Sequence, residues 1–395
     1  MKKIILLLIL TRSLTASAQE IALRDQMPDI LLPRTLDGIA GNVHSFKGKL
    51  LIIDFWATWC SPCISAMQEL EGYKKALGDN IEVLAVSGEP EERLRKFVQA
   101  RPTTLAIASD TAGTLRKLFP HQTIPHTVLI GPEGKVYAIT NASNINLDVL
   151  KVALKGINVN LPYKKDLVGF DMETYFTADS TQARHFALLP SVDGAGSMSR
   201  KYLDGPYKDR RLTIVNMPVD GLFRTAYDKN YYAMVNEYDT VKRKYEELEK
   251  FCLDAWIETP DKEKLMTFIR DELKKHFIDV KVVMEKRKQK VLVLKAKKDA
   301  KALLKPSKEK ADGYDAGGSH FKGDGVTLDA LADYIEAFGL YPGKVLNETG
   351  VEGRFDIYFE FQPEKKDDFK EKLAALGLYW EKVEREVEMM VLKKK

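Results

Sequence analysis

Two cysteines separated by two residues carry the clearest chemistry in this sequence. Cys60 and Cys63 form a Cys-x-x-Cys pair, and Cys252 stands alone much later in the chain. A thiolate is the species that attacks a disulfide, and two thiols at this spacing can exchange a disulfide with a partner. The same spacing also serves as a structural clip or as half of a metal site.

The segments on either side of the pair predict how it is positioned. Residues 50–55 are an almost unbroken apolar run, typical of a strand covered on both faces. From Ile64 onward apolar residues recur every three positions, which predicts a helix. Cys60 then stands at a helix N-terminus, where free N–H groups and partial positive charge favour a thiolate. We therefore predict that Cys60 is the nucleophile, that Cys63 resolves the mixed disulfide, and that Pro62 lies in the first helical turn.

Asp54 is the second residue that suggests chemistry. It interrupts the apolar run six positions before Cys60. A buried carboxyl group has a raised pKa and can exchange protons near neutrality, so Asp54 is a candidate base for Cys63 during resolution. The alternative is a carboxylate that is hydrogen-bonded or exposed at an edge and has no role in the reaction.

The remainder of the N-terminal half alternates strand and helix patterns. This order predicts an α/β domain with helices on both faces of a mixed sheet, because the last two strands read as a hairpin around residues 131–134. Strands are expected at 50–55, 81–86, 105–108, 126–130 and 135–139, and helices at 64–73, 90–100, 112–119 and 147–157.

The segment from Phe55 to Cys63, Phe-Trp-Ala-Thr-Trp-Cys-Ser-Pro-Cys, resembles the active-site segment of thioredoxin-like proteins. It is most similar to the exported TlpA and ResA type of disulfide reductases. Residues 27–30 and the turn at 36–38 resemble the entry into that domain. The resemblance covers residues 22–157 and implies a thioredoxin-like fold with thiol–disulfide oxidoreductase activity.

Ile124-Pro125 resembles the cis-proline loop of that family. The resemblance implies that Ile124 and Pro125 lie beside the cysteines and take part in substrate binding. The next residue is usually Thr in the family and is His126 in this chain, where it either tunes the thiolate and the substrate preference or is a surface-facing side chain. Trp59, directly before the nucleophile, is expected to shield it and to meet partners together with Pro62. Trp56 is expected in the core.

Other chemistries fit the cysteines less well. A peroxidase resembling the peroxiredoxins requires Thr or Ser three residues before the reactive cysteine and Pro four residues earlier, and Ala57 and Ile53 stand at those places. A zinc site needs about four ligands, and neither Cys252 nor the histidines supply a matching spacing. Cys252 lies in an apolar strand pattern and is expected to be buried and inert. We expect no metal and no cofactor beyond a redox-active disulfide between Cys60 and Cys63.

After an expected linker at residues 158–170, the composition becomes richer in charge. Residues 171–395 predict an α+β module with an internal duplication, with copies near 210–298 and 320–395. A resemblance to an uncharacterised, soil-associated bacterial family (DUF3738) spans roughly residues 165–395 and implies architecture but no activity. The residues that carry it are 347–356, 376–378 and 387–392.

The two copies match segment by segment. Each is expected to contain a strand, a helix, a strand, a helix and a two-stranded ribbon of its own. The matched segments are 212–229 with 321–338 and 251–257 with 355–361. Between the copies, residues 281–310 hold twelve Lys or Arg against three acidic residues. That run is either a contact for an anionic surface or, as we favour, a solvated ribbon and linker.

The first eighteen residues predict a signal peptide. Lys2 and Lys3 precede an apolar run, and small residues at 16–18 suit a signal peptidase. The alternative, an uncleaved anchor, fits poorly because the run is too short to span a bilayer. The formal net charge is +4, and residues 1–18 carry three basic and no acidic side chains, so the mature chain has a formal charge of +1. This balance gives no argument for a nucleic-acid partner.

These observations predict an exported thiol–disulfide oxidoreductase, in the periplasm or cell envelope and soluble after cleavage. We expect a reductase that exchanges two electrons with a partner protein's thiols or disulfide and is served by a membrane electron donor. One rival is a thiol oxidase of the same fold. Another is an envelope binding or sensing protein whose C-terminal module, for which the sequence names no partner, carries the main role.

Overall fold

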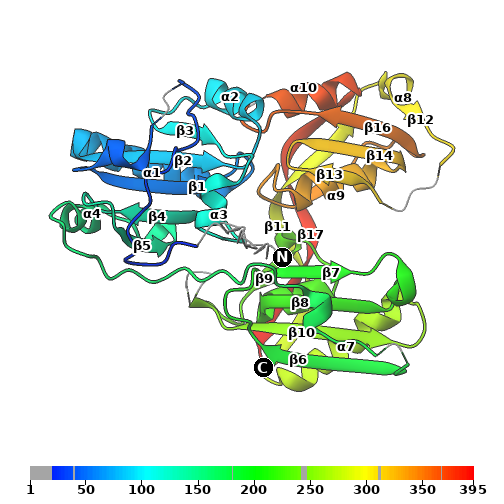
Figure 1. The fold of residues 1–395 in the computed structure, drawn as a ribbon. Coiled ribbons are helices and arrows are strands. Elements are labelled where there is room, and N and C mark those ends of the chain that lie inside the picture. Colours follow the sequence, from blue (N-terminus) through cyan, green and yellow to red (C-terminus); the bar gives the residue numbers. More distant parts are fainter. Residues whose placement is uncertain (1–19, 39–40, 180, 242–246, 310–312, 366) are drawn as a thin grey trace, which may run out of the picture. The chain divides into compact units, whose positions relative to one another are not determined.

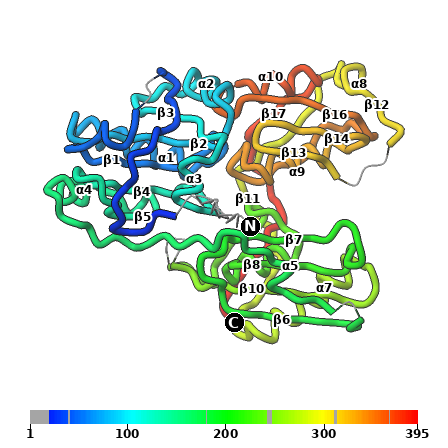
Figure 2. The backbone as a smooth tube through the Cα atoms, viewed as in Figure 1, coloured from blue at the N-terminus to red at the C-terminus, as the bar shows by residue number. Residues whose placement is uncertain are grey.

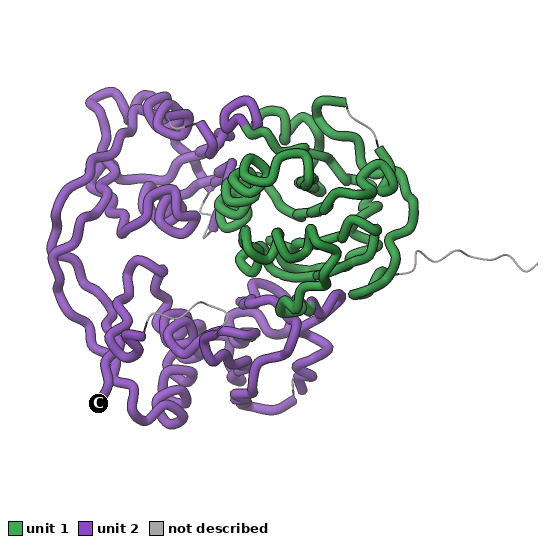
Figure 3. The backbone as a smooth tube through the Cα atoms, turned by 90° about the vertical axis from the view of Figure 1, so that its left-hand side faces the viewer, with its two compact units in different colours: residues 1–96, 103–165 green, residues 97–102, 166–395 purple. Residues whose placement is uncertain are grey.

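The computed structural model describes residues 20–38, 41–179, 181–241, 247–309, 313–365 and 367–395. The signal peptide predicted at residues 1–18 lies outside them. The chain forms two compact units (Figure 3). Unit 1 takes the described residues up to 96 together with 103–165, and unit 2 takes residues 97–102 with 166–395. The boundary at 165/166 falls within the segment expected to be a linker.

A five-stranded sheet forms the centre of unit 1, in the order β3-β2-β1-β4-β5 (Figure 1). β1, β2 and β3 run parallel, and β4 and β5 are antiparallel additions. This is the mixed sheet that the sequence predicts. The strands are β1 (Leu50–Trp56), β2 (Ile81–Ser87), β3 (Ala106–Ser109), β4 (His126–Ile130) and β5 (Val136–Thr140).

Three helices connect these strands, namely α1 (Ser61–Leu77), α2 (Glu91–Ala100) and α3 (Thr114–Leu118), and a fourth, α4 (Leu147–Ala153), follows β5. Two are shorter than expected. α3 begins at Thr114 because Gly113 is left-handed, with φ +67°, and Asp110 Oδ1 accepts the N–H of Thr114 at 2.7 Å. α4 ends at Ala153 and not at residue 157, because the chain turns away at Gly156, where φ is +74°. Short 3₁₀ helices lie at Val43–Phe46, Gly78–Asn80 and Ala142–Asn144.

β1 is buried along its whole length, as its apolar sequence predicts. Its side chains alternate between the two faces of the sheet. One set packs with α3 in a single core: Leu51, Ile53, Phe55, Leu115 and Leu118. Asp54 belongs to the opposite set.

The second half of the expected linker begins unit 2, whereas its first half is attached to unit 1. Lys164 donates its backbone N–H to the carbonyl of Ile139 on β5 at 2.9 Å, and Thr140 Oγ1 donates to the carbonyl of Pro162 at 2.7 Å. Residues 162–164 are therefore held against the end of β5.

Unit 2 is built from one element order that occurs twice. The order is a strand, a helix, a short strand, a strand, a helix and one long strand. In the first repeat these are β8 (Arg211–Pro218), α6 (Val219–Ala226), β9 (Met234–Asn236), β10 (Lys250–Ile257), α7 (Lys262–His276) and β11 (Val280–Ala296). In the second they are β14 (His320–Val326), α9 (Leu328–Ala337), β15 (Val345–Asn347), β16 (Phe355–Glu360), α10 (Asp368–Ala375) and β17 (Leu378–Lys394).

Shorter elements complete each repeat. The first includes α5 (Met172–Tyr175), β6 (Arg184–Pro190), β7 (Met198–Lys201) and 3₁₀ helices at Gly205–Tyr207 and Tyr231–Ala233. The second includes α8 (Ala300–Leu303), β12 (Lys305–Pro306) and β13 (Asp315–Gly317). The two outer sheets have the orders β6-β10-β8-β7 and β12-β16-β14-β13.

The expectation of a separate two-stranded ribbon in each copy is wrong. Each copy ends in one long strand, and the two long strands pair with each other antiparallel, from Val280 opposite Lys394 to Ala296 opposite Leu378 (Figure 2). Each short strand adds to this central sheet by pairing with the long strand of the other copy. β9 of the first copy pairs with β17, and β15 of the second copy pairs with β11. The copies therefore share a single ribbon.

Half of the twelve basic residues of the run at 281–310 lie on β11, where the register places acidic residues of β17 opposite three of them. The facing pairs are Lys286 with Glu388, Lys288 with Glu386 and Lys290 with Glu384. Lys295 also forms a salt bridge with Glu381 at 2.9 Å. Opposite charges across a strand pair offset one another. The register therefore supports the solvated-ribbon interpretation over the anionic-surface one.

Candidate redox site

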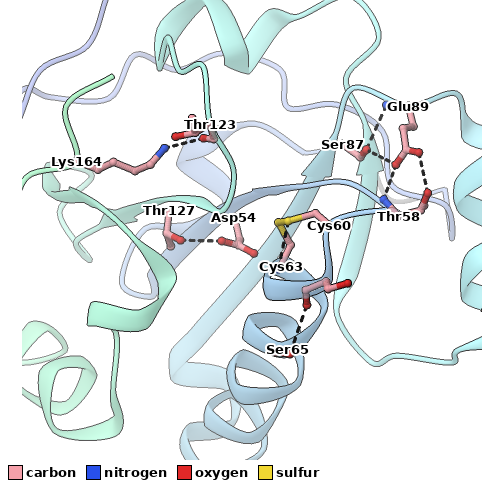
Figure 4. Close-up of a disulfide and its surroundings, with 11 residues drawn as sticks. Asp54, Thr58, Cys60, Cys63, Ser65, Ser87, Glu89, Thr123, Thr127 and Lys164 are labelled. Atoms are coloured by element: carbon pink, nitrogen blue, oxygen red, sulfur yellow. Dashed lines mark hydrogen bonds between the residues drawn. A yellow bond between two sulfur atoms is a disulfide. The ribbon is translucent and has the colours of Figure 1, made fainter. Parts of the chain in front are cut away.

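The Cys-x-x-Cys pair lies where β1 gives way to α1 (Figure 4). Cys60 is the N-cap of α1, and its Sγ accepts the backbone N–H of Cys63 at 3.3 Å. Pro62 lies in the first turn, as predicted. The two cysteines form a disulfide with a Cα–Cα distance of 5.2 Å.

Exposure distinguishes the two sulfur-bearing residues. Cys60 is 4% exposed and Cys63 is 0% exposed, so only Cys60 of the two has any surface that faces solvent. After reduction, the Cys60 thiolate would face the N-terminal N–H groups of α1, which stabilise negative charge. This asymmetry supports Cys60 as nucleophile and Cys63 as resolving thiol.

The two tryptophans near the pair differ in environment. Trp56, at the end of β1, is 2% exposed and belongs to the core, as predicted. Trp59, one residue before Cys60, is 66% exposed. A large exposed aromatic side chain next to a nucleophile is suited to contact with a partner.

Asp54 is fully buried on β1. Thr127 Oγ1, from the facing position of β4, donates to Asp54 Oδ1 at 2.7 Å, whereas Oδ2 has no hydrogen-bond partner among the described residues. Burial raises the pKa of Asp54 to about 7, and the hydrogen bond from Thr127 partly opposes that rise. Figure 4 shows the carboxyl group between Thr127 and the disulfide. The edge-exposed alternative is therefore wrong, and Asp54 can gain or lose a proton near neutral pH.

The Ile124–Pro125 peptide bond is cis, as the resemblance implies. The loop leads directly into β4, whose first residue, His126, lies opposite Phe55 on β1. The sheet register thus brings the loop to the end of β1 from which Cys60 follows. Ile124 and Pro125 are half-buried, so part of each faces solvent.

His126 is buried, and the alternative of a surface-facing side chain is wrong. Its ring stacks on His121 with centroids 4.6 Å apart and lies 5.6 Å from the ring of Phe55. Burial lowers the pKa of His126 to about 2, with further lowering by the positive charge of Lys164 and by His121. His126 is therefore a neutral imidazole behind the loop.

Glu89 supports the turn before the cysteines and was not anticipated from the sequence. Its carboxylate accepts the backbone N–H of Thr58 at 2.7 Å and the hydroxyl of Thr58 at 2.8 Å. Ser87 Oγ also donates to it at 3.2 Å. One signal could have found Glu89: it lies two residues after the end of β2, and the carboxyl ends of neighbouring parallel strands meet at one edge of a sheet.

Cys252 lies in unit 2, buried on β10. Its Sγ donates to Asn216 Oδ1 and accepts the Asn216 backbone N–H, both at 3.4 Å, and burial raises its thiol pKa. This confirms the expected buried cysteine.

In the described residues no group of three or more His, Cys, Asp or Glu side chains is arranged to hold a metal ion. No helix among them is both long and apolar enough to cross a bilayer.

Known protein families match each half of the chain, and known relatives match part of it. The AhpC/TSA family model matches residues 23–139, and the model for a protein of unknown function (DUF3738) matches residues 221–393. Thioredoxin-like protein YneN of Bacillus subtilis (strain 168) is 30% identical over 131 residues, which are 32% of this chain and 76% of that protein. Thiol-disulfide oxidoreductase ResA of Geobacillus thermodenitrificans (strain NG80-2) is also 30% identical over 131 residues, 33% of this chain and 75% of that protein.

Solved structures similar to this chain include the exposed lipoprotein thioredoxin Etrx1 from Streptococcus pneumoniae strain TIGR4. It is 23% identical, with a TM-score of 0.30, and the match covers 33% of this chain and all of that one.

A mixed sheet that carries a Cys-x-x-Cys disulfide at a helix N-terminus, beside a cis-proline loop, defines a thiol–disulfide oxidoreductase of thioredoxin-like fold. The chain belongs to the ResA-like thiol–disulfide oxidoreductases through its N-terminal region and carries a DUF3738 domain in its C-terminal region.

Proposed function

We propose that this protein is exported and acts in the cell envelope as a disulfide reductase toward partner proteins. The observation that carries the proposal is that Cys60, Cys63 and Asp54 differ in exposure and environment in a way that suits three different roles. A sparsely exposed Cys60 stands at the N-terminus of α1, a fully buried Cys63 is bonded to it, and Asp54 is a carboxyl group with a pKa of about 7. The signal-like first eighteen residues support export.

The reaction follows from these roles. The Cys60 thiolate attacks one sulfur of the partner's disulfide, so a mixed disulfide forms and the other partner sulfur leaves as a thiolate. Asp54 then accepts the proton of Cys63, and the Cys63 thiolate attacks Cys60 Sγ. This step forms the Cys60–Cys63 disulfide and releases the second partner thiolate. The partner gains two electrons, and the enzyme loses two.

Repeated turnover requires a dithiol donor that reduces the Cys60–Cys63 disulfide again. For an exported reductase we infer a membrane protein that carries electrons from the cytoplasm. We infer that the working group is the cysteine pair alone, with no bound metal or organic cofactor. The partner is a protein thiol or disulfide, and no nucleic acid is involved.

The reduction potential of the purified full chain tests the direction of electron flow. Equilibration with glutathione or dithiothreitol buffers and a mass-shift readout at Cys60 and Cys63 measures it. Thioredoxin-type reductants lie near about −270 mV and strong oxidases near about −120 mV. We expect a value near the former, and a value near the latter would reverse the assignment. The same titration of a Cys252→Ser variant controls for the third cysteine.

Trapping the mixed disulfide tests the roles of the cysteines in cells. In a Cys63→Ser chain the intermediate at Cys60 cannot be resolved, so partners should be recovered as adducts that reductant releases. A Cys60→Ser chain is the matched control and should trap none. If Cys60→Ser retained the full cellular role, the unit would be a scaffold and the C-terminal module would carry the function. Release of the chain with the periplasmic fraction tests its location.

A further inference from the structure

One side chain from outside the sheet holds both ends of the cis-proline loop. Lys164 Nζ donates to the backbone carbonyl of Thr123 at 2.6 Å and also contacts His126 Nδ1 at 3.3 Å. Thr123 directly precedes Ile124-Pro125, and His126 directly follows it. The ammonium group therefore bridges the two residues that flank the expected substrate-binding dipeptide. Figure 4 shows Lys164 extended toward Thr123 on the side of Asp54 away from the disulfide.

The chemistry of His126 suits this bridge. An ammonium group has only donors, so His126 Nδ1 must be the unprotonated, accepting nitrogen. The imidazole is buried and stacked on His121, whose own Nδ1 lies 2.8 Å from the carbonyl of Phe119. Phe55 closes the cluster, with its ring centroid 4.5 Å from that of His121. A neutral ring locked in this stack presents a fixed acceptor to Lys164.

The position of Lys164 is fixed by its own backbone. Its N–H is bonded to the carbonyl of Ile139 on β5, so the side chain extends from a segment that is itself anchored. Lys164 is half-buried, which strengthens its charged hydrogen bonds relative to those of an exposed lysine. Unit 2 begins two residues later, at Asp166.

We propose that Lys164 is a positioning residue for the cis-proline loop and sets how well this loop binds a protein substrate. This inference rests on the proposed function. The segment that leads into the C-terminal module thus contributes a residue to substrate recognition in the redox unit. Without the ammonium group, a carbonyl and a ring nitrogen behind the loop lose a donor, and the loop loses the constraint that holds its half-exposed residues ready for a partner.

The test compares a protein disulfide with a small one. The reduced full chain reacts in single turnover with insulin or with glutathione disulfide, and the mass shift at Cys60 and Cys63 reports the rate constant. We expect Lys164→Met to slow the reaction with insulin roughly tenfold, the order expected for loss of a charged hydrogen bond. The reaction with glutathione disulfide and the reduction potential should stay at the parent values, because neither depends on docking along the loop.

Three variants sharpen the test. Lys164→Arg keeps a cationic donor and should restore most of the insulin rate, whereas Lys164→Gln, a shorter neutral donor, should restore little. Lys155→Met, which removes an exposed lysine at the end of the same domain, should match the parent. Hydrogen exchange of residues 121–130 should rise in Lys164→Met and fall back in Lys164→Arg.

Distinct results overturn the inference. Equal rates with insulin in Lys164→Met and the parent show that the bridge does not matter for recognition. A parallel loss of both rates, with increased exchange throughout β1, shows a merely structural role. If the unsubstituted reduced chain reacts with neither disulfide, the proposed function itself fails, and this inference falls with it.

Discussion

Replacing Asp54 with Asn should stabilise unit 1 while it impairs the chemistry. The pKa of Asp54 is raised from 3.8 to about 7 by burial, so the folded chain holds a proton on this group that the unfolded chain releases above pH 4. Folding therefore becomes less favourable as the pH rises from about 4 to about 7. One pKa unit is worth about 1.4 kcal/mol, so the full cost above pH 7 is about 4 kcal/mol.

Asn removes this cost because it does not ionise, and it can still accept the Thr127 hydroxyl. The stability advantage of Asp54→Asn over the parent should widen by about 2–3 kcal/mol between pH 5 and pH 8. Hydrogen exchange of the β1 peptide measures the free energy of opening for unit 1 at each pH, after correction for intrinsic exchange. Asp79→Asn, at an exposed carboxylate of the same unit, is the control and should show no such widening.

The same variant should lack the base that deprotonates Cys63. The lifetime of a mixed disulfide at Cys60 should lengthen by about a hundredfold or more at pH 8, the usual contribution of a positioned base. In the parent chain, resolution should accelerate as the pH rises through 7, as Asp54 loses its proton. An Asp54→Asn chain with the parent's pH dependence, both in stability and in resolution, would refute the assignment of a buried, titrating carboxyl group.

Three further predictions concern other residues. Trp59→Ala should slow the reaction with insulin roughly tenfold and leave the reaction with glutathione disulfide unchanged, because the exposed ring next to Cys60 offers a contact surface to a protein substrate only. Stopped-flow or quenched mass spectrometry measures both rates. Cys252→Ala should leave both rates unchanged, and iodoacetamide should not label Cys252 in the native chain. Arg211→Met should destabilise unit 2 by about 3–5 kcal/mol in urea unfolding, because the buried Asp254 carboxylate loses the two hydrogen bonds that Arg211 donates at 2.9 and 3.0 Å. A double Arg211→Met, Asp254→Leu variant should recover much of the lost free energy of unfolding, because it leaves no unpaired buried charge.

The redox site was largely predictable because its parts are close in sequence. The apolar run at 50–55, the change to a helical period and the two cysteines determine the strand, the helix and the position of the disulfide between them. The fold class was also correctly predicted, from the alternation of strand and helix patterns in the first half and from the internal repeat in the second. The helix lengths at 112–119 and 147–157 were overestimated, because the cap by Asp110 delays the start of the first helix and the turn at Gly156 stops the second one early.

The supporting residues could not be predicted in the same way. Lys164 reaches the cis-proline loop from a segment that reads as linker, and its partners His126 and Thr123 lie about forty positions earlier. Glu89 meets Thr58 only because β2 lies beside β1. Such contacts depend on which strands become neighbours, and a single sequence gives no register.

The ribbon was misjudged for a related reason. Residues 280–296 alternate and carry charge in a manner that suits either a hairpin or one long strand. Both structures satisfy the same local preference for alternating side chains. Whether these residues fold back into a hairpin or pair with the matching segment of the second copy depends on the rest of unit 2.

The shared ribbon has a consequence for the order in which unit 2 folds. The end of β11 contributes Leu292 and Leu294 to the core of the second repeat, and the end of β17 contributes Met390 and Leu392 to the core of the first. The first repeat therefore cannot close its core when its own residues leave the ribosome. It must wait until β17, the last element of the second repeat, has been made. High contact order of this kind slows folding, and it makes unit 2 a single cooperative block that cannot be divided between its two copies.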